Sequence, residues 1–350
     1  MESKRNEKVD IIRGLAILMV ILGHTITSKF ISDYENNYLY KIIFSLQIPL
    51  FMIISGYVTI FTKPLNTVKS FGLYVVKRAV SYLLPWFVWT IIIRGFLLDS
   101  WTITNIPSKF NYLLWHMDTG YWFLFSLWTI CMIWGISSFI ANKFAQKDLP
   151  NIIITSFIAI VLGLGLLAVG ITLGLSFLSI KFTLYYLPFF FIGYLFSKFY
   201  PIIEKKKYFI LMRNIVIFIS LCIYTLLTVY FNVYLAQETL RDIILRMICS
   251  VTGCTIFIYI INCVFSDTIN GIKKKTAKLL SIAGRQSIGL YLSHYLFLNL
   301  IRPIEKITLN SFEGFGVCIV NYFIAIFLTS ALIYIISRNN ISKFVLFGKK

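Results

Sequence analysis

Long apolar stretches alternate with short charged or turn-rich stretches along the whole chain, and this alternation predicts a bundle of membrane-spanning helices. A helix that crosses a bilayer needs about 20 mostly apolar residues. Ten stretches of this kind can be marked. They lie near residues 11–28, 42–61, 79–98, 121–141, 151–170, 182–199, 214–235, 247–265, 286–304 and 315–336. The predicted fold class is therefore all-α, a polytopic membrane protein with about ten spans.

The composition agrees with this class and excludes a soluble globular protein. Of the 350 residues, 58% are hydrophobic and 13% are charged, and the mean hydropathy is +0.81. These values lie far from those of soluble domains. The loops between the predicted spans are too short to hold a separate domain. We therefore expect residues 1–350 to form one transmembrane domain without a soluble domain.

The basic residues predict the orientation of the bundle. If the N-terminus is cytoplasmic, 24 of the 33 lysines and arginines fall in segments on the inner side. The positive-inside rule then predicts that both termini are cytoplasmic in a cell membrane. The net charge of +19 mostly reflects this asymmetry and is spread over short loops, so it does not indicate a nucleic-acid partner. The expected surroundings are membrane lipid.

Cysteines and the first apolar stretch give two further expectations. All six cysteines fall within predicted spans, without a Cys-x-x-Cys or Cys/His pattern, so neither a metal site nor a disulfide is expected. The basic start "MESKRNEK" is followed by an apolar stretch that contains Arg13 and His24 and has no small-residue cleavage site. We expect this stretch to be a retained span and not a signal peptide.

The first predicted span, "DIIRGLAILMVILGH" (residues 10–24), carries ionisable residues into the membrane. His24 follows Arg13 by eleven positions, so both project from one helix face about 16 Å apart along the axis. Arg13 alone could be an anchor that extends to the cytoplasmic interface. A histidine as deep as His24 normally faces a cavity or a partner, so His24 is a candidate functional residue.

The chemistry open to His24 is that of a neutral imidazole, which can act as a general base or as a nucleophile. None of the 14 acidic residues falls deep inside a predicted span. A proton-coupled pump commonly carries protons on buried carboxylates. The sequence therefore argues against a pump and leaves His24 to be oriented by a hydroxyl, an amide, a backbone group or water.

The second and third spans contribute weaker candidates near their predicted cytoplasmic ends. In "QIPLFMIISGY" (residues 47–57), Gly56 permits a close approach of another backbone or of a ligand, while Ser55 and Tyr57 supply hydroxyls. Taken alone, this stretch is better interpreted as a helix-packing motif. Lys77 and Arg78 lie at the predicted cytoplasmic mouth of the third span. They are either topology signals or a binding site for an anionic ligand such as a phosphate.

The ninth predicted span contains the other polar stretch, "GRQSIGLYLSH" (residues 284–294). Ser287, Tyr291 and His294 lie at positions i, i+4 and i+7, which form one stripe along a helix. Such a stripe either lines a cavity that binds substrate or joins helices through hydrogen bonds. His294 is the strongest of the three as a functional residue.

Six stretches together resemble the integral-membrane acyltransferase-3 family, whose members O-acylate sugars of surface polysaccharides and related acceptors. The first stretch resembles the family's Arg-x10-His helix with its preceding Asp. The others follow in family order across residues 10–294. They are "PLFMIISGY" (49–57), "KRAVSYLLP" (77–85), "YWFLFSL" (121–127), "YLPFFFIGY" (186–194) and the Ser…Tyr-Leu-x-His of "GRQSIGLYLSH".

The resemblance implies a stand-alone O-acetyltransferase similar to fucose 4-O-acetylases, with no permanently bound cofactor and with cytoplasmic acetyl-CoA as donor substrate. His24 would be the catalytic histidine, and Arg13 would help to hold the donor or the active geometry. Several family members have a second arginine shortly after the one that matches Arg78, but here Ser81 and Tyr82 occupy those places. Contacts to the donor phosphates would then come from Arg13, Lys77 and Arg78, or from the lysine runs 205–207 and 273–275.

These observations predict a membrane O-acyltransferase that moves an acyl group to a sugar hydroxyl of a surface polysaccharide or of its lipid-linked precursor. Ser55, Tyr57, Ser287, Tyr291 and His294 would contact the acceptor. The alternative is a transporter of a lipid-linked sugar or glycan that performs no acyl transfer. Consumption of acetyl-CoA distinguishes the two, because a transporter would not consume it.

Overall fold

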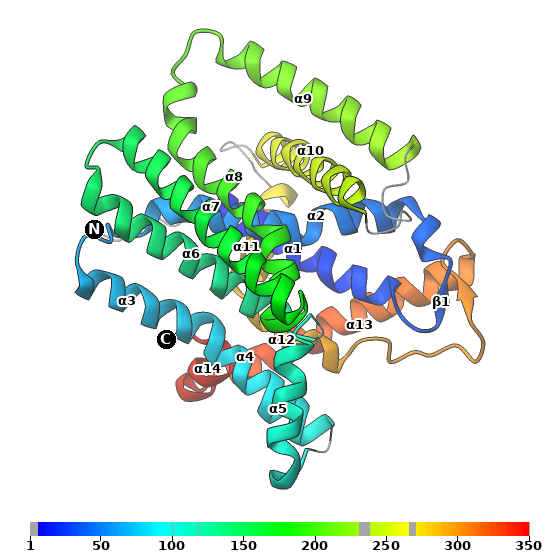
Figure 1. Cartoon of the computed structure of the whole chain (residues 1–350). Coiled ribbons are helices and arrows are strands. Elements are labelled where there is room, and N and C mark those ends of the chain that lie inside the picture. The colour runs from blue at the N-terminus through cyan, green and yellow to red at the C-terminus, as the bar shows by residue number, and fades with distance from the viewer. Residues whose placement is uncertain (1–5, 100, 119, 231–238, 266–270, 350) are drawn as a thin grey trace. The chain divides into compact units, whose positions relative to one another are not determined.

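The structure is a computed structural model that describes residues 6–99, 101–118, 120–230, 239–265 and 271–349 (Figure 1). Helices dominate it. Their bounds are Glu7–Ile26 (α1), Tyr38–Tyr57 (α2), Val68–Arg78 (α3), Leu84–Phe87 (α4), Ile106–Trp115 (α5), Trp122–Phe144 (α6), Asp148–Leu173 (α7), Ile180–Ile203 (α8), Phe209–Thr225 (α9), Leu240–Val264 (α10), Ile272–Arg285 (α11), Ser287–Ser293 (α12), Phe312–Ile336 (α13) and Asn340–Phe347 (α14). The strands are Ile31–Ser32 (β1) and Ile307–Thr308 (β2).

Nine helical segments of the described part are long and apolar enough to cross a membrane, and each overlaps one of the predicted spans. The predicted all-α, multi-pass membrane class is therefore confirmed. The third segment, Val68–Leu98, runs from α3 through a π-helical stretch at 79–83 into α4 and ends in a second π-helical stretch at 88–98. Residues 231–235 of the predicted seventh span lie outside the described residues.

The predicted ninth span, 286–304, was wrong in its position. The helical structure begins at Ile272 in α11, breaks at Gln286 and continues through α12 to a final turn at 294–296. A hydropathy scan misses α11 because its buried residues are small (Ala277, Ser281 and Gly284) and its lysines are exposed. The chain after residue 296 is irregular because Asn299 has a positive φ of 54° and Pro303 cannot donate a backbone hydrogen bond.

The described residues form two compact units, which we describe separately. Unit 1 comprises residues 1–54 and 198–335, and unit 2 comprises residues 55–197 and 336–350. Unit 1 contains α1, α9 to α13 and most of α2, and unit 2 contains α3 to α7, α14 and most of α8.

In unit 1 the closest helix packing joins α1 to α11. A Cβ atom built at Gly14 would overlap the carbonyl oxygen of Leu280, and one built at Gly284 would overlap the carbonyl oxygen of Asp10. Two glycines therefore let the two backbones touch, as small residues do at helix interfaces in membranes. Helices α9 and α10 also lie side by side in this unit (Figure 1).

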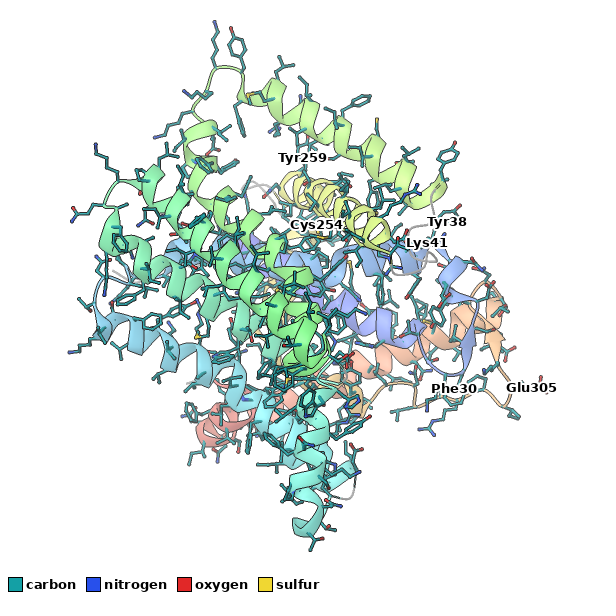
Figure 2. All side chains as sticks on the ribbon, in the orientation of Figure 1. Phe30, Tyr38, Lys41, Cys254, Tyr259 and Glu305 are labelled. Atoms are coloured by element: carbon teal, nitrogen blue, oxygen red, sulfur yellow. The ribbon has the colours of Figure 1, made fainter. Side chains whose placement is uncertain are left out.

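A short parallel strand pair closes one end of unit 1. Ile31 pairs with Ile307 and Ser32 with Thr308, and the Asn37 amide donates to Asn310 Oδ1 at 2.6 Å. Figure 2 shows Phe30 and Glu305 at this end, where β1 follows α1 by only a few residues. The strand pair thus ties the chain that follows α1 to the chain that follows α12.

Unit 2 is held by packing of α6 against α7 and against α3. The Tyr74 hydroxyl of α3 donates to the carbonyl oxygen of Cys131 on α6 at 2.9 Å. Helix α14 folds back beside α4 (Figure 1), and the Trp89 indole donates to the carbonyl oxygen of Leu346 at 2.9 Å. These contacts fix the helix that carries Arg78.

Candidate active site

The candidate site in unit 1 is centred on His24, which lies in the last turn of α1. Its Nε2 atom is 2.9 Å from the hydroxyl oxygen of Tyr295. The ring centre of His24 lies 5.3 Å from that of His294. Residues 270 or more positions apart in the sequence therefore meet where α1 ends and α12 ends.

His294 is fully buried, with an exposed fraction of 0%. Its Nδ1 atom lies 3.0 Å from the carbonyl oxygen of Leu290. A carbonyl oxygen can only accept, so the neutral ring carries its proton on Nδ1 and a lone pair on Nε2. That Nε2 atom has no hydrogen-bond partner within the described part of the chain. A buried acceptor in this state is suited to a hydrogen bond from a ligand.

We call His24, Tyr291, His294 and Tyr295 the His–Tyr cluster. The Tyr295 ring centre lies 4.2 Å from that of His294, and the Tyr291 ring centre lies 6.1 Å from it. Of the residues that the sequence analysis selected, the structure thus brings His24, Tyr291 and His294 together. Ser287 lies at the start of α12, about 10 Å from His294 along the helix axis.

Tyr295 is the member of the cluster that sequence reasoning missed. A signal for it exists, because Ser287, Tyr291 and Tyr295 lie at positions i, i+4 and i+8, the same helical stripe followed one turn further. The predicted stripe contains His294 in its last position instead. Both residues contact the cluster, because the ring centres of His294 and Tyr295 lie 5.3 Å and 4.9 Å from that of His24.

Arg13 lies on α1 three turns before His24, and α1 is helical throughout Glu7–Ile26. The rise of a helix places the two positions about 16 Å apart along the axis and on nearly the same face. Arg13 is half-buried. The geometry expected from the eleven-residue spacing is therefore present in the backbone.

The candidates of unit 2 form a different environment, around the end of α3. The Arg78 guanidinium carbon lies 5.1 Å from the ring centre of Tyr74 and 6.0 Å from that of Tyr82, and an Arg78 amino group donates to the Tyr82 hydroxyl at 3.4 Å. Its buried Nε atom has no hydrogen-bond partner among the described residues. Lys77, in contrast, is exposed. Only Arg78 of this pair is enclosed by aromatic rings.

The end of α2 supplies Ser55, Gly56 and Tyr57 to unit 2. A Cβ atom at Gly56 would overlap the carbonyl oxygen of Phe190 on α8. Of the two alternatives for Gly56, a backbone or a ligand, the structure shows a backbone. The ring centre of Tyr57 lies 6.2 Å from that of Phe196, also on α8. These contacts are typical of helix packing, which the sequence had offered as an alternative to substrate binding.

Metal chemistry has no evident site in the part of the chain that the structure describes. No group of three or more His, Cys, Asp or Glu side chains there could hold a metal ion. The polar groups of the His–Tyr cluster can instead accept or donate protons, and the Arg78 guanidinium can bind an anion. The cluster of unit 1 thus offers general-base chemistry, and the environment of Arg78 in unit 2 offers anion binding.

Comparison with known proteins decides the family. A family model described as an acyltransferase domain matches residues 6–338. The chain belongs to the acyltransferase-3 family. This membership confirms the resemblance found in the sequence and the expected enzyme class, an acyltransferase that is a multi-pass membrane protein.

Among curated relatives, this acyltransferase-3 family member is similar to the nodulation protein NolL of Sinorhizobium fredii (strain NBRC 101917 / NGR234). The two are 29% identical over 201 residues, which cover 56% of this chain and 50% of NolL. The match thus spans about half the length of each protein. No solved structure matches the chain.

Proposed function

We propose that this acyltransferase moves an acyl group, in the first instance acetyl, from cytoplasmic acyl-CoA to a sugar hydroxyl. The acceptor would be a surface polysaccharide or its lipid-linked precursor, and the site of action the bacterial cytoplasmic membrane with both termini inside. The observation that carries the proposal is the His–Tyr cluster. Two imidazoles, at least one with a free lone pair, meet in a helix bundle whose family transfers acyl groups.

The donor side of the proposal rests on cations. Acyl-CoA is anionic, and a guanidinium binds phosphate through paired N–H donors. Arg13 stands about 16 Å before His24 on one helix, a separation that an extended thioester arm is of the right order to bridge. Arg78, with an unpartnered buried Nε, and the exposed Lys77 are the other proposed contacts to the donor.

The acceptor side rests on hydrogen-bonding groups that suit a hydroxyl. The unpartnered Nε2 of His294 would accept from a sugar hydroxyl. Tyr291 and Ser287 would line the same stripe, because they precede His294 on α12. We also propose that Ser55 and Tyr57, which belong to unit 2, contact the acceptor.

In the reaction, a histidine of the cluster takes the proton from the acceptor hydroxyl while its oxygen attacks the thioester carbonyl. The new C–O bond forms, the C–S bond breaks, and the thiolate leaves as CoA-SH after taking up that proton. His24 can do this as a general base. It can also attack the thioester itself: a C–N bond to the ring forms, the C–S bond breaks, and the thiolate leaves as CoA-SH with the ring proton. The acceptor oxygen then takes the acyl group as the C–N bond breaks, and the acceptor proton returns to the ring. Label retained on the protein distinguishes the second route from the first.

The test is transfer of radiolabelled acetyl from acetyl-CoA in membranes that contain the wild-type protein or a variant. His24→Ala should abolish label in glycan and in acetate. His116→Ala is the matched control, because His116 is an exposed histidine on the turn after α5, and it should retain wild-type transfer. If the wild type consumes no acetyl-CoA with host acceptors present, the proposal fails and glycan transport becomes the better explanation.

A further inference from the structure

Tyr295 makes a polar contact with His24, yet none of the stretches that resemble the family includes it. Its hydroxyl oxygen lies 2.9 Å from His24 Nε2, and the two ring centres lie 4.9 Å apart. Its exposed fraction is 37%, against 0% for the neighbouring His294. Tyr295 is therefore the member of the pair at positions 294 and 295 that a ligand reaches first.

The direction of the bond follows from the chemistry of the two groups. A phenol is a stronger acid than a neutral imidazole N–H, and a bare imidazole nitrogen is a stronger acceptor than a phenol oxygen. The favoured arrangement is thus Tyr295 O–H donating to a lone pair on His24 Nε2. This arrangement puts the proton of the His24 ring on Nδ1.

His24 differs in this respect from the other two histidines of the chain. His294 and His116 each place Nδ1 3.0 Å from the carbonyl oxygen four residues earlier. The backbone selects the tautomer of those two rings. For His24 the described residues place a hydrogen bond at Nε2, and its partner is a side chain.

We propose that Tyr295 is the positioning residue for His24. Its hydroxyl keeps the neutral ring in the tautomer with the lone pair on Nε2 and holds that atom in place. A sugar hydroxyl then replaces the phenol at Nε2 and delivers its proton there. This role rests on the proposed acyl transfer, because it supplies the base or nucleophile of that reaction.

Chemical modification tests the bond without relying on activity. Diethyl pyrocarbonate reacts with the unprotonated nitrogen of a neutral imidazole, and the chain contains only 3 histidines, so peptide mass spectrometry resolves each one. Tyr295→Phe keeps the ring and removes the donor. Carbethoxylation of His24, normalised to the exposed His116, should then rise by about 3- to 10-fold, the range expected when one hydrogen bond no longer shields the nitrogen.

The chain offers a matched control for loss of a tyrosine hydroxyl. In unit 1 the Tyr224 hydroxyl lies 2.9 Å from Ser45 Oγ, the same length as the bond at His24. Tyr224→Phe should leave the His24 rate unchanged. 3-Fluorotyrosine at position 295 keeps the hydroxyl and makes it a stronger donor, so it should slow His24 carbethoxylation below the wild-type rate even if Tyr295→Phe folds poorly.

The kinetic arm separates positioning from simple packing. In Tyr295→Phe, kcat should fall by about 10-fold or more, while KM for acetyl-CoA stays within twofold because the donor contacts are untouched. Two results would overturn the inference. One is an unchanged rate of His24 carbethoxylation in Tyr295→Phe, and the other is a raised rate of carbethoxylation together with a wild-type kcat. If the wild type shows no acyl transfer, the proposed function fails instead, and carbethoxylation alone still decides whether Tyr295 holds His24.

Discussion

The Gly14–Gly284 crossing predicts that one added methyl group disables the enzyme from a distance. In Gly14→Ala the new Cβ would lie 2.9 Å from the carbonyl carbon of Leu280 and 3.2 Å from the amide nitrogen of Gly284, with the carbonyl oxygen of Leu280 closer still. All three atoms are backbone and cannot move aside alone. Since carbon atoms pack at about 3.5–4.0 Å, α1 and α11 must separate by about 1 Å.

Two magnitudes follow from this separation. Overpacking of this kind destabilises a protein by about 1–3 kcal/mol, which the better helix propensity of Ala offsets by about 1 kcal/mol. Helix α1 also carries His24, while α12 follows α11 directly and leads to His294 and Tyr295. A displacement of about 1 Å at reacting groups can lower a rate by about 100-fold. We therefore expect a modest loss of stability and a large loss of kcat.

The assay compares Gly14→Ala with Gly316→Ala by thermal unfolding in detergent and by acetyl transfer. Gly316 lies in α13, where a Cβ would meet no atom within 4 Å, so this control keeps only the gain in helix propensity. It should unfold at or slightly above the wild-type temperature with full activity. Wild-type stability and kcat in Gly14→Ala would refute the reasoning.

Further predictions concern both units. His294→Ala should lower kcat/KM for the acceptor by about 10-fold or more, because it removes the orphaned Nε2 acceptor; full activity at limiting acceptor would contradict this. Arg78→Gln should raise KM for acetyl-CoA several-fold, and Lys77→Gln less, because only Arg78 is enclosed by Tyr74; equal effects would argue against a site built on Arg78. Trp89→Phe should lower the free energy of unfolding by about 1 kcal/mol and raise proteolysis near α14, because the Trp89 indole donates to the α14 backbone. An unchanged proteolytic pattern would show that this bond does not hold α14.

The local rules of a helix explain which features were predictable. The apolar runs fixed the spans because a helix must present about 20 apolar residues to lipid, and the helical period alone placed Arg13 and His24 on one face. The same rules failed for 286–304. There the helix begins early because α11 buries small residues against α1, and such residues carry little hydropathy signal.

The candidate residues, too, could be selected from the sequence, but their surroundings could not be predicted from it. Arg78 could be selected by charge, but its enclosure by Tyr74 and Tyr82 depends on the π-helical turn that follows α3. Ser55 and Tyr57 could be selected as polar groups, yet Gly56 beside them serves the contact with α8. The sequence shows which chemical groups are present. Which residues surround each group depends on the local backbone and on the packing of other helices.

The sequence by itself determined the membrane class and the family, and it selected His24 as a candidate, because hydropathy, helix periodicity and motif order are properties of neighbouring residues. Only the tertiary structure decided that His24 meets Tyr295 and His294, which lie 271 and 270 positions later. That meeting depends on the packing of α1 against α11, where two glycines allow backbone contact. Contacts between residues so far apart are set by how helices pack, and the local pattern around either residue does not encode them.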